Sequence, residues 1–448
     1  MKELWFSRRQ ALAGLGAVAL AGSSRFAFAA TALPPVNIVI NQSPWLASFR
    51  ATVDLYQQQS GNKVNLEVVP FDGMLAKQRN SVRASTGDYD ILILNSGWFA
   101  EMYFGGFTTA LTDVDPSFKL DPDIFTLGNT IYFDPASKTM TPSGKLMAMP
   151  IQPNIPMLFY RGDLYKEKGL KVVETFDDLL ANAKALHNPP KMYGIIQRGA
   201  RGANTVSYDF YPYLFGMGGA VFKDQVGGDY TVTLNNDKGK AALDYYLRLA
   251  KEAGHPKTAS QDQAQIIQSL VTGHCAHASL VIAAWSQMDD PNQSVVADKI
   301  EYAPTPHSPG LPPGPALGHW LGSVAHNVPD DRKRAAVEFF RWFQTRDAQL
   351  ANLKAGGIPL NAWVYKDPLA DERKNRWMKP LAAALPHAIN PYDFPEATEV
   401  VAVLELGLNR AIAGEITSSD ALNSMSDDIY KVMEKYKYKT GEGAKLGA

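Results

Sequence analysis

Three short apolar runs that alternate with two amphipathic stretches constrain the fold of this chain more than any other feature. The apolar runs have the length and composition of strands, and the stretches between them space their apolar side chains as helices do. In chain order these segments are strands over residues 36–40, 64–68 and 89–94 and helices over residues 46–59 and 73–87. Strands that alternate with helices predict an α/β fold, with a parallel sheet and helices on both of its faces.

Polar residues and a tryptophan follow the first and the third of these strands. They are Gln42, Ser43 and Trp45 after the first strand and Asn95, Ser96 and Trp98 after the third. In open α/β sheets, ligands bind in the crevice at the carboxyl ends of the strands. Amide, hydroxyl and indole groups suit a ligand with polar edges and apolar faces, which describes a sugar ring. We therefore expect these six residues to contact a sugar or a sugar-like polyol.

The first 29 residues have the pattern of an export signal. Ser-Arg-Arg at residues 7–9 precedes an apolar run over residues 11–21, and Ala-Phe-Ala at residues 27–29 is a small-x-small cleavage site. The apolar run is shorter than the roughly 20 residues that a membrane-spanning helix needs. We interpret this segment as a twin-arginine signal peptide that is cleaved near Ala29 or Ala30 after the chain has used the twin-arginine translocase. The expected location is the periplasm.

Charge and cysteine content exclude several classes of partner. The 44 Lys and Arg residues nearly balance the 45 Asp and Glu residues and are scattered, so the chain predicts neither nucleic-acid binding nor a polybasic membrane anchor. Cys275 is the single cysteine, so no intramolecular disulfide can form and the signal lacks a lipid-accepting cysteine. We expect a freely soluble protein, not a lipoprotein, that is a monomer.

Several helices are predicted beyond the first sheet. Thr175 begins one with a capping pattern, and Asn236 begins another. Residues 332–353 read as one strongly helical run, and residues 396–436 as a further amphipathic helical region.

His274, Cys275 and His277 briefly suggest a metal site. The apolar run that follows reads as a buried strand up to Trp285, in which neighbouring side chains point to opposite faces. A tetrahedral zinc site would need a second cluster of ligands, and the sequence offers none. The chain also lacks a dinucleotide fingerprint, a Gly-x-Ser-x-Gly elbow and a His-Glu-x-x-His motif. We predict no metal, no cofactor and no catalytic residues, although a glycosidase that uses only carboxylates stays open.

The order and spacing of motifs over some 400 residues carry a resemblance. The motifs include YDILILNSGWFAEMYFGGF from residue 89, LMAMPIQPNIPMLFYRGDLYKEKGL from residue 146, TFDDLLANAKAL from residue 175, KRAAVEFFRWFQTRDAQ from residue 333, GGIP at residues 356–359 and ALNSMSDDIYKVM from residue 421. From about Val36 to Tyr436 the chain resembles extracellular solute-binding protein family 1, the maltose-binding-protein-like group of ABC importer components.

This resemblance implies a type II periplasmic binding protein fold, in which two α/β lobes joined by a hinge close over a ligand cleft. Lobe 1 would take residues 35–148 and 304–354, and lobe 2 would take residues 149–303 and 355–448. The closed form would deliver its ligand to the permease subunits of an ABC transporter.

Motif matching also implies site residues in the second half of the cleft. Asn154 stands where the maltose binder has a hinge-side carboxylate, Tyr208 and Asp209 match an aromatic and an acidic contact, and Trp285 resembles a stacking tryptophan. Trp320 and Trp363 lie beside loops that would face the cleft, as does Tyr392. Asn361 replaces an arginine that many members carry, which argues against an acidic sugar at that point.

Other ligands remain open at this stage. Related two-lobed binders take polyamines, ferric iron, thiamine or phosphate esters, and the 19 tyrosines of this chain could include an iron-binding pair. The predicted cleft residues are nevertheless richer in tryptophan and amide side chains, which favours a sugar or polyol.

Overall fold

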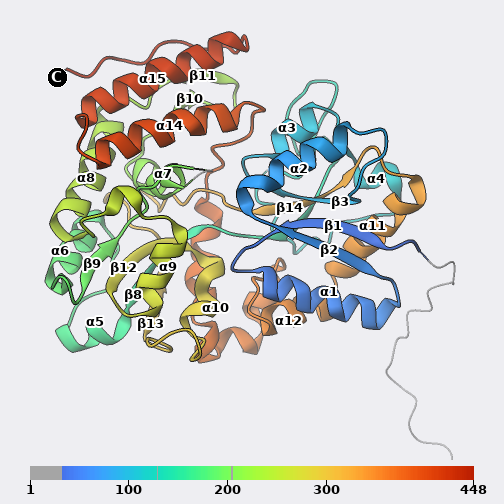
Figure 1. Cartoon of the computed structure of the whole chain (residues 1–448), viewed down its shortest axis with the longest axis horizontal. Coiled ribbons are helices and arrows are strands. Elements are labelled where there is room, and N and C mark those ends of the chain that lie inside the picture. The colour runs from blue at the N-terminus through green and yellow to red at the C-terminus, as the bar shows by residue number, and fades with distance from the viewer. Residues whose placement is uncertain (1–32, 129, 203–204, 448) are drawn as a thin grey trace, which may run out of the picture. The chain divides into compact units, whose positions relative to one another are not determined.

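The computed structural model describes residues 33–128, 130–202 and 205–447 (Figure 1). The predicted signal peptide, over residues 1–29, lies outside the described residues, so the structure does not bear on it. Within the described ranges, no helix is long and apolar enough to cross a membrane.

A mixed sheet is formed mainly by the first part of the chain. Its strands have the order β2-β1-β3-β14-β4, and β7 also pairs with β14. Their bounds are β1 Val36–Asn41, β2 Val64–Val69, β3 Ile91–Asn95, β4 Thr108–Thr109, β7 Met149–Gln152 and β14 Trp320–Ala325. The pairs β1–β2 and β1–β3 are parallel, as the alternation of strands and helices predicts. The sheet as a whole is mixed, because the later strand β14 runs antiparallel to β3, β4 and β7.

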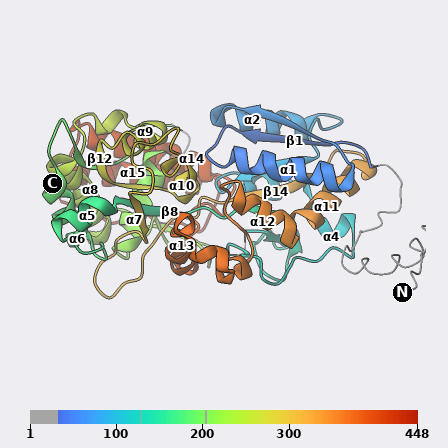
Figure 2. The same ribbon diagram turned by 90° about the horizontal axis from the view of Figure 1, so that it is seen from below.

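Helices cover this first sheet. They are α1 Leu46–Ser60, α2 Phe71–Arg83, α3 Phe99–Phe104, α4 Leu111–Val114, α11 Asp330–Phe343 and α12 Arg346–Lys354. Figure 1 shows α2 and α3 on one side of the strands and α1 on the other, and Figure 2 shows α11 and α12 on the same side as α1. Gly61 ends α1 with φ +75°, a left-handed conformation that glycine adopts without strain.

The helical run expected over residues 332–353 comprises two helices, α11 and α12. The hydroxyl of Thr345 accepts the backbone N–H of Ala348 and begins the second helix. An N-cap residue has non-helical backbone angles, so it interrupts a run whose apolar spacing alone predicts continuity.

A second sheet has the strand order β13-β8-β12-β9. Its strands are β8 Pro156–Arg161, β9 Tyr193–Ile196, β12 Cys275–Val281 and β13 Ile300–Ala303, and two small hairpins pair β5 Tyr132–Phe133 with β6 Lys145–Leu146 and β10 Phe222–Asp224 with β11 Asp229–Val232. The helices of this part are α5 Gly162–Lys168, α6 Phe176–Leu186, α7 Val206–Gly216, α8 Asp237–Ala253, α9 Gln263–Val271, α10 Trp285–Met288, α13 Met378–Ala384, α14 Ala397–Ile412 and α15 Ser418–Lys435. The predicted caps at Thr175 and Asn236 both accept backbone N–H groups.

The expected buried strand through Trp285 ends earlier, at Val281. A short 3-10 turn over Ile282–Ala284 follows, and Trp285 begins α10. The lobe boundaries remain predictions: the strands of the first sheet fall within residues 36–152 and 320–325, and those of the second within residues 156–303.

His277 is a structural residue of β12. Its Nδ1 donates to the carbonyl of Gly194 at 2.7 Å, and its Nε2 accepts the hydroxyl of Tyr165 at 2.5 Å. With the proton of the neutral imidazole on Nδ1, Nε2 is free to accept the hydroxyl of Tyr165. Burial lowers the pKa of His277 to about 4.

Candidate ligand-binding site

Two adjoining cavities lie at the carboxyl ends of β1 and β3. The first, which we call the polar chamber, has a volume of about 530 Å³ and is lined mainly by amide, hydroxyl and indole side chains together with Arg198. The second, which we call the apolar chamber, has a volume of about 560 Å³. Phe71 and Asn95 line both chambers.

Nine of the twelve predicted contact residues line these chambers. Gln42, Ser43, Trp45, Asn95, Ser96, Asn154, Tyr208 and Trp320 line the polar chamber, and Asn95 and Trp98 line the apolar one. Tyr392 also lines the apolar chamber. The turn after β1 is formed by backbone bonds: the N–H of Gln42 donates to the carbonyl of Val69, and the N–H of Leu46 donates to the carbonyl of Ser43. These bonds fix the turn that carries Gln42 and Ser43 between the end of β1 and the start of α1.

An aromatic cluster joins the two chambers. The ring of Trp320 lies 5.7 Å from that of Trp45 and 5.8 Å from that of Trp98, measured between centroids. Phe71 lies 5.0 Å from Trp98, with an angle of 31° between their planes. Each of these side chains is held by its aromatic neighbours, so the chamber walls are preorganised.

Several buried polar atoms of the polar chamber have no hydrogen-bond partner among the described residues. They are Asn41 Oδ1, Ser43 Oγ, Trp45 Nε1, Arg198 Nε and Gln287 Oε1. A buried polar atom without a partner costs free energy, typically 1–3 kcal/mol. A polyhydroxylated ligand carries both donors and acceptors of the kind that such atoms need.

Arg198 is the cationic residue among the described residues that line the polar chamber. The carboxylate of Asp209 accepts the backbone N–H of Arg198. Nη2 of Arg198 donates to Gln263 Oε1 at 2.9 Å. The guanidinium carbon of Arg198 lies over the ring of Tyr208, 5.6 Å from its centroid. The backbone N–H of Arg198 donates to Asp209 Oδ2 at 3.0 Å, and the hydroxyl of Tyr246 donates to the same oxygen at 2.7 Å. Burial raises the pKa of Asp209, and the nearby guanidinium opposes that rise.

Asp209, Trp285 and Trp363 line neither chamber. Asp209 is turned toward the backbone of Arg198, and Trp363 lies under the guanidinium of Arg346 at 4.3 Å. Trp285 stacks on Trp377, with 5.1 Å between ring centroids and 28° between planes. Gln287, two residues after Trp285, lines the polar chamber instead.

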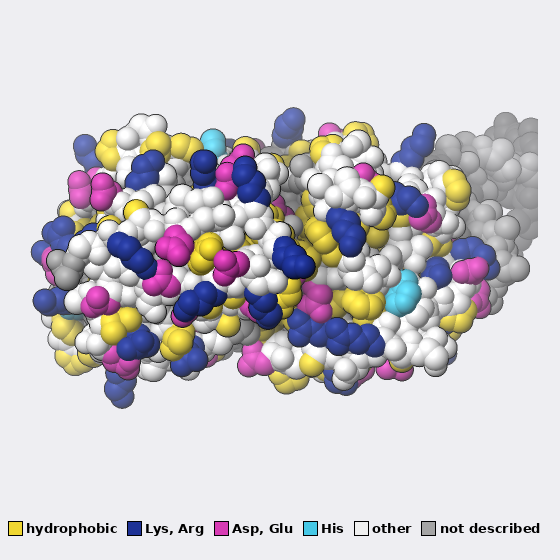
Figure 3. All heavy atoms as spheres, turned by 90° about the horizontal axis from the view of Figure 1, so that it is seen from above, with side chains coloured by type: hydrophobic (Ala, Val, Ile, Leu, Met, Phe, Trp, Pro, Cys, Tyr) yellow, Lys and Arg dark blue, Asp and Glu magenta, His cyan; other side chains and the backbone are white. Residues whose placement is uncertain are grey.

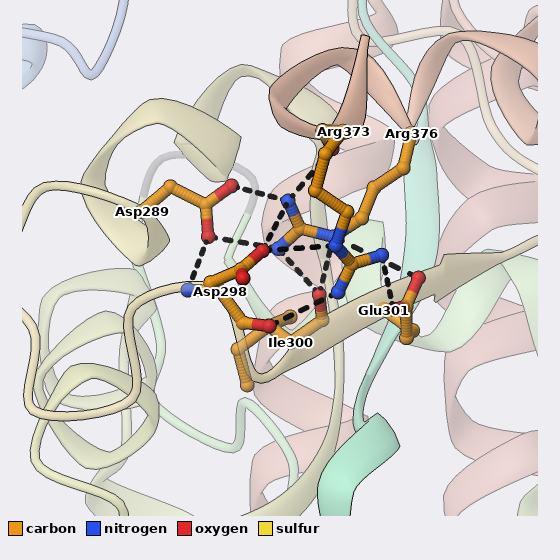
Figure 4. A network of polar contacts seen from close by, with 6 residues as sticks. All are labelled: Asp289, Asp298, Ile300, Glu301, Arg373 and Arg376. Atoms are coloured by element: carbon orange, nitrogen blue, oxygen red, sulfur yellow. Dashed lines mark hydrogen bonds and ion pairs between the residues drawn. The ribbon is translucent and has the colours of Figure 1, made fainter. Parts of the chain in front are cut away.

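An ion-pair network holds the segment that carries Trp377 (Figure 4). Arg376 pairs with both carboxylate oxygens of Asp289, at 2.6 and 2.8 Å, and donates to the carbonyl of Ile300. Arg373 pairs with Asp298 and Glu301. The side chain of Arg376 is 8% exposed, whereas that of Arg373 is 52% exposed. The pair of Arg376 with Asp289 is therefore buried, whereas the pair of Arg373 with Asp298 is exposed to solvent.

Sequence reasoning missed four of the lining residues, namely Phe71, Arg198, Gln263 and Gln287. Arg198 follows β9, which ends at Ile196 and pairs in parallel with β12. The rule that placed Gln42 and Asn95 at strand ends would therefore have found Arg198, had it been applied to the second sheet. Asn361, where the resemblance implies an arginine in many members, is buried and donates to Asp121 Oδ2 at 3.0 Å.

Residues 41–350 match the family described as bacterial extracellular solute-binding protein. The chain belongs to this family. Its members bind solutes and carry out no chemistry on them, and extracellular or periplasmic location is a property of the family.

Three relatives align with most of the chain at low identity. A probable ABC transporter-binding protein of Deinococcus radiodurans is 24% identical over 70% of this chain and 73% of its own length. A probable amino-acid ABC transporter periplasmic-binding protein of Sinorhizobium fredii is 23% identical over 66% of each. An erythritol/L-threitol-binding protein of Mycolicibacterium smegmatis is 21% identical over 78% of this chain and 73% of its own length.

Solved structures share the fold. A solute-binding protein of Agrobacterium radiobacter in complex with ribitol superposes with a TM-score of 0.76 at 23% identity, and covers 89% of this chain and 98% of its own. Maltose-bound MalE3 of T. maritima gives a TM-score of 0.77 at 22% identity, covering 89% of this chain and 99% of its own. The fold is thus the α/β periplasmic binding protein fold, as the resemblance to the maltose-binding-protein-like group implies.

Proposed function

We propose that this protein is the substrate-binding component of an ABC importer and that it captures a sugar or polyol in the polar chamber. The observation that carries the proposal is the set of five buried polar atoms without partners on residues that line the polar chamber together with Trp45 and Trp320. Hydroxyl groups both donate and accept hydrogen bonds, so one polyol can satisfy amide oxygens, an indole N–H and a guanidinium together. The names of relatives and structures that bind erythritol, ribitol and maltose support the same class.

The proposal includes export and delivery. The chain would leave the cytoplasm with its twin-arginine signal, lose residues 1–29, and act in the periplasm. Ligand contacts made from both predicted lobes would favour the closed form, which would dock on the permease. The residues at each side of the polar chamber would be Gln42, Ser43, Trp45 and Asn95 on one and Arg198 and Tyr208 on the other.

An amino acid is the second candidate ligand. Arg198 could pair with an α-carboxylate, and Asp262, which also lines the polar chamber, could face an ammonium group. The carboxylate of Asp262, however, already accepts the N–H groups of Ala264 and Gln265 at the start of α9. A sugar or polyol is favoured because, apart from Arg198 Nε, the unpartnered atoms of the polar chamber belong to neutral side chains.

The test is the melting temperature of the mature protein, residues 30–448, with panels of sugars, polyols and amino acids. A ligand at a thousand times its dissociation constant adds about 4 kcal/mol to the native state. With about 2.1 cal/mol/K of unfolding entropy per residue, this corresponds to a rise of about 4 °C or more. A rise with a sugar or polyol supports the proposal, whereas a rise only with amino acids, or no rise with any compound, refutes it. The variant Arg198→Met separates the two classes further, because it should abolish binding of a carboxylate but only weaken that of a polyol.

A further inference from the structure

The apolar chamber is as large as the polar one and shares the lining residues Phe71 and Asn95 with it. The two volumes are about 560 and 530 Å³. A ligand that filled only the polar chamber would leave the Trp98 side of the site in contact with water. The combined volume of the two adjoining chambers therefore indicates a ligand with two parts.

The two chambers differ in the hydrogen bonds they offer. None of the buried side-chain polar atoms that lack partners among the described residues belongs to the lining of the apolar chamber. Glu405, its buried carboxylate, accepts the N–H of Gly202 at 2.8 Å and both the N–H and the hydroxyl of Ser207, at 2.9 and 2.6 Å. Asn95 Oδ1 accepts the N–H of Gly97 at 3.1 Å. The buried polar groups of this chamber are therefore already engaged by the protein.

Aromatic and aliphatic side chains form much of the wall of the apolar chamber. The ring centroids of Phe71 and Trp98 lie 5.0 Å apart with 31° between the ring planes, and the buried Tyr392 and Val401 line the chamber with them. Asp72 and Arg201 also line it but are exposed to solvent. A second sugar ring would bring three or more hydroxyls into a space with few unused buried partners, which is costly. An aromatic ring brings no such groups and gains by stacking and by burial of apolar area.

We infer that the ligand is an aryl glycoside, with its sugar in the polar chamber and its aromatic aglycone in the apolar chamber beside Phe71 and Trp98. This inference rests on the proposed sugar-binding function and narrows its substrate class. No bond is made or broken, since the protein binds the intact glycoside.

Isothermal titration of the mature protein with matched compounds tests the inference. For glucose, galactose, mannose and xylose, the probes are the free sugar, the methyl glycoside, the phenyl glycoside and a disaccharide with that sugar at its non-reducing end. For the sugar that binds, the phenyl glycoside should bind on the order of tenfold to a hundredfold more tightly than the methyl glycoside, given the apolar area of one ring.

A variant that fills the chamber makes the test specific. Ala402 is an exposed position of α14 that lines the apolar chamber, so Ala402→Trp should remove the advantage of the phenyl glycoside and leave the affinity for the methyl glycoside unchanged. Leu406→Trp, one turn further along α14 and outside the lining, is the matched control and should keep the advantage.

The outcomes separate the inference from the proposed function. If free sugars, polyols or methyl glycosides bind but phenyl glycosides bind no more tightly, the inference is overturned and the proposed function stands. A disaccharide that binds more tightly than the phenyl glycoside overturns it as well. If neither sugars nor polyols nor glycosides bind, the proposed function fails and the inference fails with it.

Discussion

Replacement of Arg376 by methionine should destabilise the protein by about 3 kcal/mol. The guanidinium is 8% exposed and bonds both oxygens of Asp289, which is itself 14% exposed, so the change leaves a largely buried carboxylate without its partner. Removing one partner of a buried pair typically costs 3–5 kcal/mol, and the partial exposure of Asp289 favours the lower end. The carbonyl of Ile300 also loses its donors.

The assay is thermal unfolding of the mature protein combined with urea titration. With an unfolding entropy of about 2.1 cal/mol/K per residue over some 400 residues, 3 kcal/mol corresponds to a fall in Tm of about 3–4 °C. Arg373→Met is the matched control, because Arg373 is itself 52% exposed and pairs with the 70% exposed Asp298 and the 29% exposed Glu301. Such exposed pairs contribute at most about 1 kcal/mol.

A double-mutant cycle with Asp289→Asn decides whether the pair itself is responsible. Asparagine keeps an acceptor for the N–H of Asp298 but carries no charge. The double variant should therefore be more stable than the sum of the two single effects by at least about 1 kcal/mol. Strict additivity, or an Arg373→Met variant that loses as much stability as Arg376→Met, would refute the reasoning.

Three further predictions concern the cleft, pH and the thiol. Ser43→Ala should weaken binding of the sugar about fivefold to tenfold in a titration, the effect of one hydrogen bond, and leave Tm without ligand within about 1 °C, because the buried Ser43 hydroxyl has no partner among the described residues; a fall in Tm with unchanged affinity would contradict this. Because burial lowers the pKa of His277 to about 4, the unfolded state binds more protons below its ordinary pKa of about 6.5, so stability should be complete above pH 6.5 and decline as the pH falls from 6.5 toward 4. Urea titrations at pH 7 and pH 5 should show a smaller decline for His277→Gln than for wild type, whereas the exposed His387→Gln should decline like wild type; equal declines in all three proteins would refute the assignment. Burial raises the pKa of the Cys275 thiol, so it should react with a thiol reagent only after denaturation, and rapid labelling of the native protein would show that this strand opens.

Local patterns in the sequence predicted much of the fold. The five segments from residue 36 to residue 95 follow from apolar spacing, and the capped helices after Thr175 and Asn236 follow from side-chain oxygens that accept backbone N–H groups. The position of β14 could not be predicted in this way, because its pairing with β3 depends on residues more than 200 positions apart.

The same distinction between local patterns and long-range contacts applies to the residues of the candidate site. Residues at strand ends, such as Gln42 and Asn95, could be found because the end of a strand is visible in the sequence. Trp285, predicted as a contact, lines neither chamber: its ring stacks on Trp377, a neighbour that is 92 positions away and carries no local signal. Basic and acidic side chains are interspersed on the face that Figure 3 shows, as they are along the sequence.

The late arrival of β14 has a consequence for synthesis of the chain. Until residues 320–325 leave the ribosome, β3, with its wholly buried sequence ILILN, would be an uncovered edge of the first sheet. At about 5–20 residues per second, the delay between β3 and β14 lasts about 10–45 s. Uncovered apolar edges pair with other chains. A nascent chain of this protein therefore needs protection by a chaperone over that interval, and chains that terminate before Trp320 should aggregate rather than accumulate as a folded half.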